Sequence, residues 1–267
     1  MRTDPSSAAE NSPATLPGAS VPRPLRSTRS PTLLSAAAQK AIRQRMLLFR
    51  STALGRIAEL TGATAEELKR YRRELLASSL PDLLLQRGAG LPFTRELPQG
   101  ALLYLLVRAQ RPDRIVETGV RPGYSTAWLL AGLEANGTGE LVSLGPGSPQ
   151  GRAAGVHQVS VGQFVPPGLR SRWTLVLGNS EERLQELLNG NQRIDVFLYD
   201  NGPDVVRARF ELHSAWAALS ERGILMAHHI EANPAWSEFC RAQGVPDQLL
   251  DPGPPPMGAV AMQTPRR

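Results

Sequence analysis

The sequence is poor in the features that build disulfide-linked or membrane-embedded proteins. Cys240 is the only cysteine among 267 residues, which excludes an intrachain disulfide. No stretch approaches the roughly 20 consecutive apolar residues that a membrane-spanning helix needs. The first residues also lack the apolar core of a secretory signal. These absences predict a soluble protein in a reducing compartment, the cytoplasm, with no membrane partner.

Several common catalytic signatures are missing as well. The chain contains neither the Gly-x-Ser-x-Gly elbow of many hydrolases nor the Gly-Lys-Ser/Thr loop that binds nucleotide phosphates. The segment ETGVRPGYST, residues 117–126, has two glycines where the dinucleotide-binding pattern has three. This difference disfavours an NAD-dependent enzyme.

Aromatic residues are scarce, and few of them lie in the basic part of the chain. Residues 1–73 contain 13 Lys and Arg against 5 Asp and Glu, whereas residues 74–267 contain 17 against 19. A basic surface can bind nucleic acid, but few aromatic side chains are present there to stack on bases. The pattern therefore favours a solvated, arginine-rich face and disfavours a nucleic acid partner.

The chain divides into three parts by composition. Residues 1–30 are rich in Pro, Ser and Ala without apolar periodicity, which predicts a disordered tail. Residues 31–110 show helical spacing, beginning with a predicted helix at 33–49, and we expect a helical appendage. Within it, Thr64 and Glu67 have the spacing of a capping box at a helix start. Residues 111–267 form the third part.

In the third part, short apolar runs alternate with helical patterns. Strands are predicted at 114–120, 140–145, 173–178, 194–200, 223–230 and 258–263, with helices at 125–137, 180–190, 204–223 and 233–244. Nearly all-apolar strands that alternate with helices predict an α/β fold, a doubly wound and mostly parallel sheet covered on both faces. Ligands of such sheets bind beyond the carboxyl ends of the strands. We therefore expect the functional residues directly after each strand.

Taken in order, these strand ends resemble a known family. The segments VETGVRPGYST, IDVFLYDNG and LSERGILMAHHI are similar to motifs of the class I S-adenosylmethionine-dependent methyltransferases. Within that class they resemble the small-molecule O-methyltransferases of the catechol O-methyltransferase-like, cephalosporin-hydroxylase-like and macrocin types. The resemblance implies a seven-strand, Rossmann-like sheet behind a helical appendage. It also implies S-adenosylmethionine as cofactor and a small hydroxylated acceptor, such as a sugar or natural product.

The resemblance assigns roles to individual residues. It implies that Glu117 steadies the first loop and contacts the amino group of the cofactor, and that Asp200 is the acidic residue of the catalytic face. It further implies two groups of cofactor-binding residues, one around the methionine part and one near the adenine: Gly119, Gly123, Tyr124 and Ser125, and Asn179 and Ser180.

Structural roles compete with these assignments at two positions. Ser180 also fits a helix N-cap, because Glu181 and Glu182 follow it in the favourable first turn. Tyr124 also fits a packed core aromatic.

One expected residue is absent. In the family, the strand that corresponds to residues 140–145 ends in an acid that binds both ribose hydroxyls, but this chain has Gly145 there. Hydrogen bonds to a charged acceptor contribute about 1.5–3 kcal/mol each, so losing a pair weakens cofactor binding by about 100-fold or more. Either another residue compensates, for example from the segment GPGSPQG at 145–151, or the ligand differs.

The second departure is a histidine pair. His228 and His229 stand where metal-dependent relatives have carboxylates or amides that bind Mg²⁺. With Asp200 they offer a set of two imidazoles and one carboxylate, which suits Fe(II), Mn(II) or Zn(II) better than Mg²⁺. Adjacent strand residues point to opposite faces, so both reach one ion only if the strand ends near Ala227. One histidine acting as general base, or simply packing in the core, is the alternative.

The sequence thus favours O-methylation of a small molecule, with Asp200, His228 and His229 as catalytic residues. Two alternatives stay open: a methyltransferase-like binding or scaffold protein that has lost the reaction, and a metal-dependent enzyme that uses the same three residues. The helical appendage is expected to cover the acceptor pocket or to form a homodimer contact.

Overall fold

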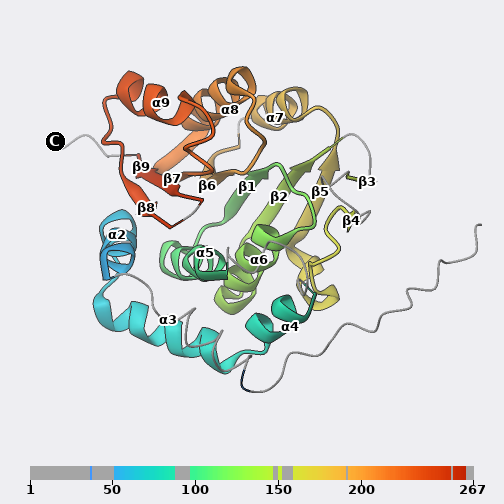
Figure 1. Ribbon diagram of the computed structural model, residues 1–267, viewed down its shortest axis with the longest axis vertical. Coiled ribbons are helices and arrows are strands. Elements are labelled where there is room, and N and C mark those ends of the chain that lie inside the picture. Colours follow the sequence, from blue (N-terminus) through green and yellow to red (C-terminus); the bar gives the residue numbers. More distant parts are fainter. Residues whose placement is uncertain are drawn as a thin grey trace, which may run out of the picture. The chain divides into compact units, whose positions relative to one another are not determined.

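The sheet and its flanking helices lie within the part of the chain that the structure describes. This computed structural model describes Ala37 and residues 51–87, 97–146, 150–151, 159–190, 192–253 and 255–262. The predicted disordered tail, the predicted helix at 33–49 except Ala37, and most of the segment after Gly145 lie outside these residues. In the described part, helices cover both faces of a seven-stranded sheet (Figure 1).

The sheet has the order β5-β2-β1-β6-β7-β9-β8. Its strands are β1 (Arg114–Thr118), β2 (Glu140–Gly145), β5 (Trp173–Leu177), β6 (Ile194–Tyr199), β7 (Leu219–His228), β8 (Leu249–Asp251) and β9 (Met257–Ala261). The first five are parallel, and β9 runs antiparallel to both of its neighbours. A separate short pair consists of β3 (Gln150–Gly151) and β4 (Val159–Ser160). The predicted mostly parallel sheet of seven strands is confirmed.

Alternate side chains of the strands enter two separate cores. Helices of the first face are α5 (Leu97–Gln110) and α6 (Tyr124–Asn136), and those of the second are α7 (Ser180–Asn189), α8 (Val205–Ala218) and α9 (Ala235–Gln243). On β1, Ile115 packs with the first group and Val116 with the second, and both are fully buried. This alternation follows from the two-residue repeat of an extended strand. It explains why the strands are apolar throughout their length.

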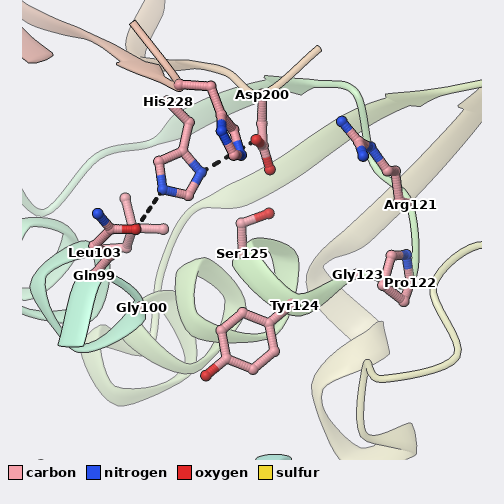
Figure 2. A pocket seen from close by; sticks show the side chains of 11 residues that line it. Gln99, Gly100, Leu103, Arg121, Pro122, Gly123, Tyr124, Ser125, Asp200 and His228 are labelled. Atoms are coloured by element: carbon pink, nitrogen blue, oxygen red, sulfur yellow. Dashed lines mark hydrogen bonds and ion pairs between the residues drawn. The ribbon is translucent and has the colours of Figure 1, made fainter. Parts of the chain in front are cut away.

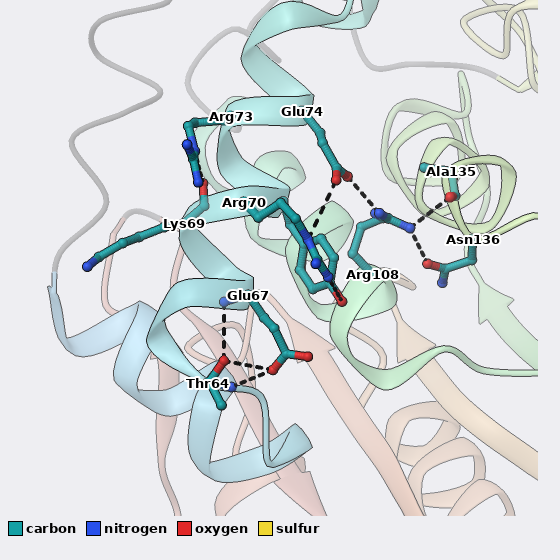
Figure 3. Close-up of polar contacts among 10 residues, drawn as sticks. Thr64, Glu67, Lys69, Arg70, Arg73, Glu74, Arg108, Ala135 and Asn136 are labelled. Carbon is teal, nitrogen blue, oxygen red and sulfur yellow. Dashed lines mark hydrogen bonds and ion pairs between the residues drawn. The ribbon is translucent and has the colours of Figure 1, made fainter.

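The helical appendage continues the first layer. Its helices are α2 (Ser51–Thr61), α3 (Ala65–Ala77) and α4 (Leu80–Arg87). The predicted capping box is present at the start of α3 (Figure 3): Thr64 Oγ1 accepts from the Glu67 amide at 3.2 Å, and Glu67 Oε2 accepts from the Thr64 amide at 2.9 Å. These bonds satisfy two amide groups that a helix start otherwise leaves unpaired.

A buried arginine ties the appendage to the sheet-covering helices. Arg108 on α5 donates to Glu74 Oε2 on α3 at 2.6 Å, and to the Ala135 carbonyl on α6 at 2.8 Å (Figure 3). It also donates to Asn136 Oδ1, and its guanidinium lies 4.5 Å from the centre of the Tyr71 ring. Because one guanidinium bonds to groups of both α3 and α6, it fixes the last turn of α5 against these two helices.

The structure corrects the boundary between α8 and β7. The sequence predicts a helix through Gly223, but α8 ends at Ala218 and residues from Leu219 onward pair with β6. Ser220 Oγ also donates to Asp195 Oδ1 at 2.6 Å. Strand pairing and this side-chain bond override the helical propensity of the segment. Strand β8 was not predicted, because three residues are too few to show a periodicity.

Among the described residues, no helix has the length and apolar character that crossing a bilayer requires.

Candidate active site

The carboxyl ends of β1, β6 and β7 meet at one place, as parallel pairing requires. Asp200 follows β6 directly, and its amide donates to the Thr118 carbonyl at the end of β1 at 3.0 Å. Gly119, with φ of 87°, lies against the same backbone: a Cβ there would collide with the carbonyl of Asp200. The glycine is therefore needed so that the loop after β1 can lie directly on the loop after β6.

His228 is held from both sides. It is the last residue of β7 and its side chain is only 4% exposed. Nδ1 lies 3.2 Å from Asp200 Oδ1, and Nε2 lies 2.6 Å from Gln99 Oε1, which comes from the first turn of α5 (Figure 2). The imidazole thus connects the appendage side of the molecule to the catalytic acid predicted from the sequence.

His229 occupies a different environment from its neighbour. Its φ of 54° lies in the left-handed region, which non-glycine residues seldom adopt. In an extended strand, adjacent side chains point to opposite faces. The left-handed turn at His229 interrupts this alternation, so the imidazoles of His228 and His229 line the same pocket, with ring centres 4.9 Å apart. The His229 side chain is about one third exposed. Partial burial, and then the proximity of His228, lower the pKa of His229 below its ordinary value.

These residues line a pocket that is partly open to solvent. The empty space between its walls, open solvent included, is about 530 Å³. The lining comes from four places in the sequence: the first turns of α5, the segment from the end of β1 into α6, the residue after β6, and the end of β7. These residues are Gln99, Gly100, Leu103, Arg121, Pro122, Gly123, Tyr124, Ser125, Asp200, His228 and His229.

The residues predicted to bind the methionine part differ in depth: some line the pocket and one lies below it. Gly123, Tyr124 and Ser125 line the pocket, whereas Glu117 is completely buried below it. Tyr124 also packs edge-on against Trp128, with ring centres 6.3 Å apart, so the packing role considered for this tyrosine is present too. Gly123 has φ of 83°, and a Cβ there would meet a Val165 methyl at 2.9 Å.

Glu117 organises the start of α6 from beneath. Its carboxylate accepts hydrogen bonds from Ser125 Oγ, from Thr126 Oγ1 at 2.7 Å and from Ser143 Oγ on β2 at 2.8 Å. Burial raises the pKa of Glu117 to about 7, although these hydroxyl donors act in the opposite direction. The loop-steadying part of its predicted role agrees with this geometry, and contact with an amino group stays a prediction.

Asn179 and Ser180, the residues predicted near the adenine, form hydrogen bonds with groups of the protein itself. Asn179, not Ser180, is the N-cap of α7, because its Oδ1 accepts from the amides of Glu181 and Glu182. Ser180 Oγ instead donates to the buried Glu211 at 2.5 Å. The N-cap considered for Ser180 therefore lies one residue earlier, at Asn179. Proximity of either residue to an adenine stays a prediction.

Gly145 is enclosed by apolar side chains. A Cβ at this position would meet Val120 Cγ1 at 2.9 Å and Leu177 Cδ2 at 3.1 Å. The acid that the family uses to bind ribose does not fit here without displacing these neighbours. The glycine is thus part of a locally consistent packing arrangement. Residues 147–149 of the segment considered as a replacement lie outside the described part.

Asp200, His228 and His229 approach the geometry of a metal site. Each offers one ligand atom, and these atoms lie within 4.8 Å of one another. In a tetrahedral site with bonds of about 2.1 Å the ligand atoms lie about 3.4 Å apart, so the most widely separated atoms would have to come about 1.4 Å closer together to complete the site. Two imidazoles and a carboxylate are a suitable donor set for Fe(II) or Zn(II).

Four residues at this edge of the sheet were missed from the sequence. Asn201 Nδ2 donates to Glu211 Oε1 at 2.8 Å, which links the loop after β6 to α8, and Gln99 and Arg121 line the pocket. A signal existed for Glu211, since an acid on a helix face shared with Ala208 and Leu212 is unusual in a core. Burial raises the pKa of Glu211. Gln99 gave no signal, because it lies far from any strand end in the sequence.

Comparison with known proteins identifies the type of domain. Residues 116–230 match the family model described as methyltransferase domain. The fold resembles a Podospora anserina methyltransferase solved with S-adenosylhomocysteine (17% identity, TM-score 0.53, covering 74% of this chain and 95% of that one). It also resembles a putative O-methyltransferase from Klebsiella pneumoniae (18% identity, TM-score 0.50, 85% and 97% covered). No curated protein matches the chain in sequence.

Proposed function

Starting from the class I methyltransferase domain that this chain carries, we propose that the protein transfers a methyl group from S-adenosylmethionine to an oxygen of a small hydroxylated molecule. One observation carries the proposal. Asp200, His228 and His229 line the same pocket as Ser125 at the start of α6. Groups that can orient or deprotonate a hydroxyl therefore face the place where the cofactor is expected to lie.

The start of α6 suits the methionine part of the cofactor. Gly123 precedes the helix in a left-handed conformation and makes no side-chain cap, so the first amides of α6 are available to a carboxylate. The Ser125 hydroxyl lies beside them, held by the buried Glu117. The adenosine part has weaker support, because Val120 and Leu177 fill the space beside Gly145 where the ribose-binding acid would stand.

His229 is the better placed general base of the pair. Its side chain is partly exposed in the pocket, whereas both ring nitrogens of His228 face protein atoms. When bound, S-adenosylmethionine supplies a methyl group made electrophilic by the positive sulfur. His229 would take the proton of the acceptor hydroxyl on a ring nitrogen. The oxygen would then bond to the methyl carbon while the methyl–sulfur bond breaks and its electron pair goes to sulfur, which leaves S-adenosylhomocysteine. Asp200 orients the hydroxyl. Alignment of the reactants contributes about 7–11 kcal/mol.

We expect S-adenosylmethionine and S-adenosylhomocysteine to bind with dissociation constants in the micromolar range, weakened by the missing ribose contact. Titration calorimetry on the full chain measures both. Ser125→Ala should weaken binding. The control is Ser237→Ala, which removes a half-buried serine hydroxyl on α9 that donates to the Pro234 carbonyl, and it should leave binding unchanged. No detectable binding of either compound would refute the proposal and favour the binding or scaffold protein.

A metal-dependent reaction is the second candidate, favoured by the grouping of Asp200, His228 and His229. A bound divalent ion would polarise the acceptor oxygen and lower the pKa of its hydroxyl. These three side chains would hold the ion and leave further coordination positions to water or substrate. The homodimer and the cytoplasmic location also stay predictions.

The second candidate predicts that the purified protein takes up about one Zn(II) or Mn(II) per chain. Competition with a chromophoric chelator measures the affinity, and His229→Ala should reduce it strongly. The matched control is His213→Ala, which removes an exposed histidine of α8. Equal metal affinity in the wild type and the His229→Ala variant would exclude an ion at this site.

A further inference from the structure

Gln99 is a buried polar residue that belongs to the catalytic edge although it lies outside the matched methyltransferase domain. It stands in the first turn of α5, and it is only 3% exposed. A buried amide must satisfy its donors and its acceptor within the protein. Both ends of Gln99 have partners that are distant in the sequence. Nε2 bonds to the Pro255 carbonyl, and Oε1 lies beside His228, as Figure 2 shows.

The orientation of the Gln99 amide follows from its first partner. Nε2 donates to the backbone carbonyl of Pro255. A carbonyl oxygen only accepts hydrogen bonds, so the amide nitrogen must be the atom on that side. The amide oxygen then has to face His228, where it lies 2.6 Å from Nε2. A flipped amide would place two oxygens against each other at the Pro255 side.

The orientation of the amide in turn decides which nitrogen of His228 carries hydrogen. The amide oxygen is an acceptor without hydrogen, so His228 Nε2 must donate. The remaining nitrogen, Nδ1, lies 3.2 Å from Asp200 Oδ1. Asp200 alone would favour hydrogen on Nδ1, because a carboxylate also accepts. Gln99 and Asp200 therefore impose opposite preferences on a neutral ring, and the shorter contact is the one to Gln99.

We propose that Gln99 is a positioning residue that keeps a proton on Nε2 of His228, against the preference of Asp200 for hydrogen on Nδ1. The proline carbonyl holds the glutamine, and the glutamine holds the imidazole. Such partners of a histidine's second nitrogen commonly fix the ring's tautomer and orientation. The effect of Gln99 on catalysis rests on the proposed function, whereas its effect on the tautomer of His228 does not.

Nitrogen-15 NMR of histidine-labelled full-length protein tests the tautomer directly, and only four histidines contribute signals. Spectra recorded where the imidazoles are neutral should show His228 with hydrogen on Nε2, assigned with the His228→Asn variant. Gln99→Met removes the acceptor but keeps the length, and should move the proton to Nδ1. In Gln99→Glu a protonated carboxyl can donate to the Pro255 carbonyl and still present its other oxygen to His228, so it should keep the proton on Nε2.

The matched control is Gln110→Met, a glutamine on the same helix whose amide donates to the Arg222 carbonyl far from the pocket. It should leave the His228 signals unchanged. A wild-type spectrum with bare Nε2, or a Gln99→Met spectrum identical to the wild type in a variant that melts cooperatively, would overturn the proposal. A merely structural role for Gln99 lowers the melting temperature without changing the tautomer.

An activity measurement separates this inference from the proposed function. With catechol as acceptor and release of S-adenosylhomocysteine as the signal, Gln99→Met should lower kcat about 10- to 100-fold with unchanged cofactor affinity. Gln99→Glu should recover much of that loss. A tautomer that depends on Gln99 in a protein that binds no cofactor would contradict the proposed function alone. Equal kcat for both Gln99 variants and the wild type would refute the catalytic consequence.

Discussion

His229→Ala is expected to lower the rate of methyl transfer by about 10²- to 10⁴-fold while leaving the affinity for S-adenosylmethionine nearly unchanged. That range is the usual contribution of a positioned general base. His229 is the histidine whose side chain is partly exposed in the pocket, and its lowered pKa keeps it neutral and ready to accept a proton near pH 7. The measurement is S-adenosylhomocysteine release with a panel of catechols and hydroxylated sugars, beside calorimetry for binding.

Two variants make this experiment specific. His213→Ala removes an exposed histidine of α8 that hydrogen-bonds to Gln243 of α9 and does not line the pocket. This variant should retain full activity. Asp200→Asn should lower the rate as well, because the loss of a carboxylate disturbs both the acceptor and His228. If His229→Ala and His228→Ala each retained the wild-type rate, the catalytic assignment of the pair would be wrong.

Glu117→Gln is expected to abolish a pH dependence of stability that amounts to about 3 kcal/mol. Burial raises the pKa of Glu117 from its ordinary value of 4.5 to about 7, and each pKa unit corresponds to about 1.4 kcal/mol. A raised pKa means that the folded state binds the proton more tightly than the unfolded state. The stabilisation is therefore fully present below about pH 4.5 and is lost as the pH rises through about 7.

Urea unfolding of the wild type and of Glu117→Gln between pH 4.5 and 8 measures this contribution. The wild type should lose stability relative to the variant across that window, and the difference should become constant above about pH 8. Glu140→Gln serves as the control, since this glutamate begins the neighbouring strand and is exposed. A constant difference between wild type and Glu117→Gln over the whole window would show that Glu117 is not protonated in the folded protein.

Much of the fold follows from local pattern. Four strands of the parallel part of the sheet, all except β7, were predicted with boundaries within two residues of those observed, because apolar runs between helical segments are a strong signal. The capping box of Thr64 and Glu67 was predicted from spacing alone and is present. The C-terminal part of α8 was predicted wrongly, because Leu219 and its successors prefer a helix locally and form a strand only through pairing with β6.

The prediction that His228 and His229 can share a pocket with Asp200 depended on where β7 ends. From the sequence alone, one can see that β7 must end near Ala227 for both imidazoles to face Asp200, but not whether it does. The left-handed conformation of His229, which brings the two rings together, is set by the tertiary environment of that turn. The same limit applies to Gly145. Its lack of a side chain is visible in the sequence, whereas the filling of the space by Val120 and Leu177 appears only when neighbouring strands and loops are assembled.

The sequence by itself determined the class of fold, the edge of the sheet where the candidate site lies, and the carboxylate and imidazoles at the ends of β6 and β7. These properties depend on residue type and on the repeat of apolar positions, which are local. Tertiary structure alone decided that Gln99 bonds to both Pro255 and His228, and that Glu211 accepts from Ser180. Such contacts join residues that are 31 to 156 positions apart. A local sequence pattern cannot predict them, because the two segments meet only in the folded sheet.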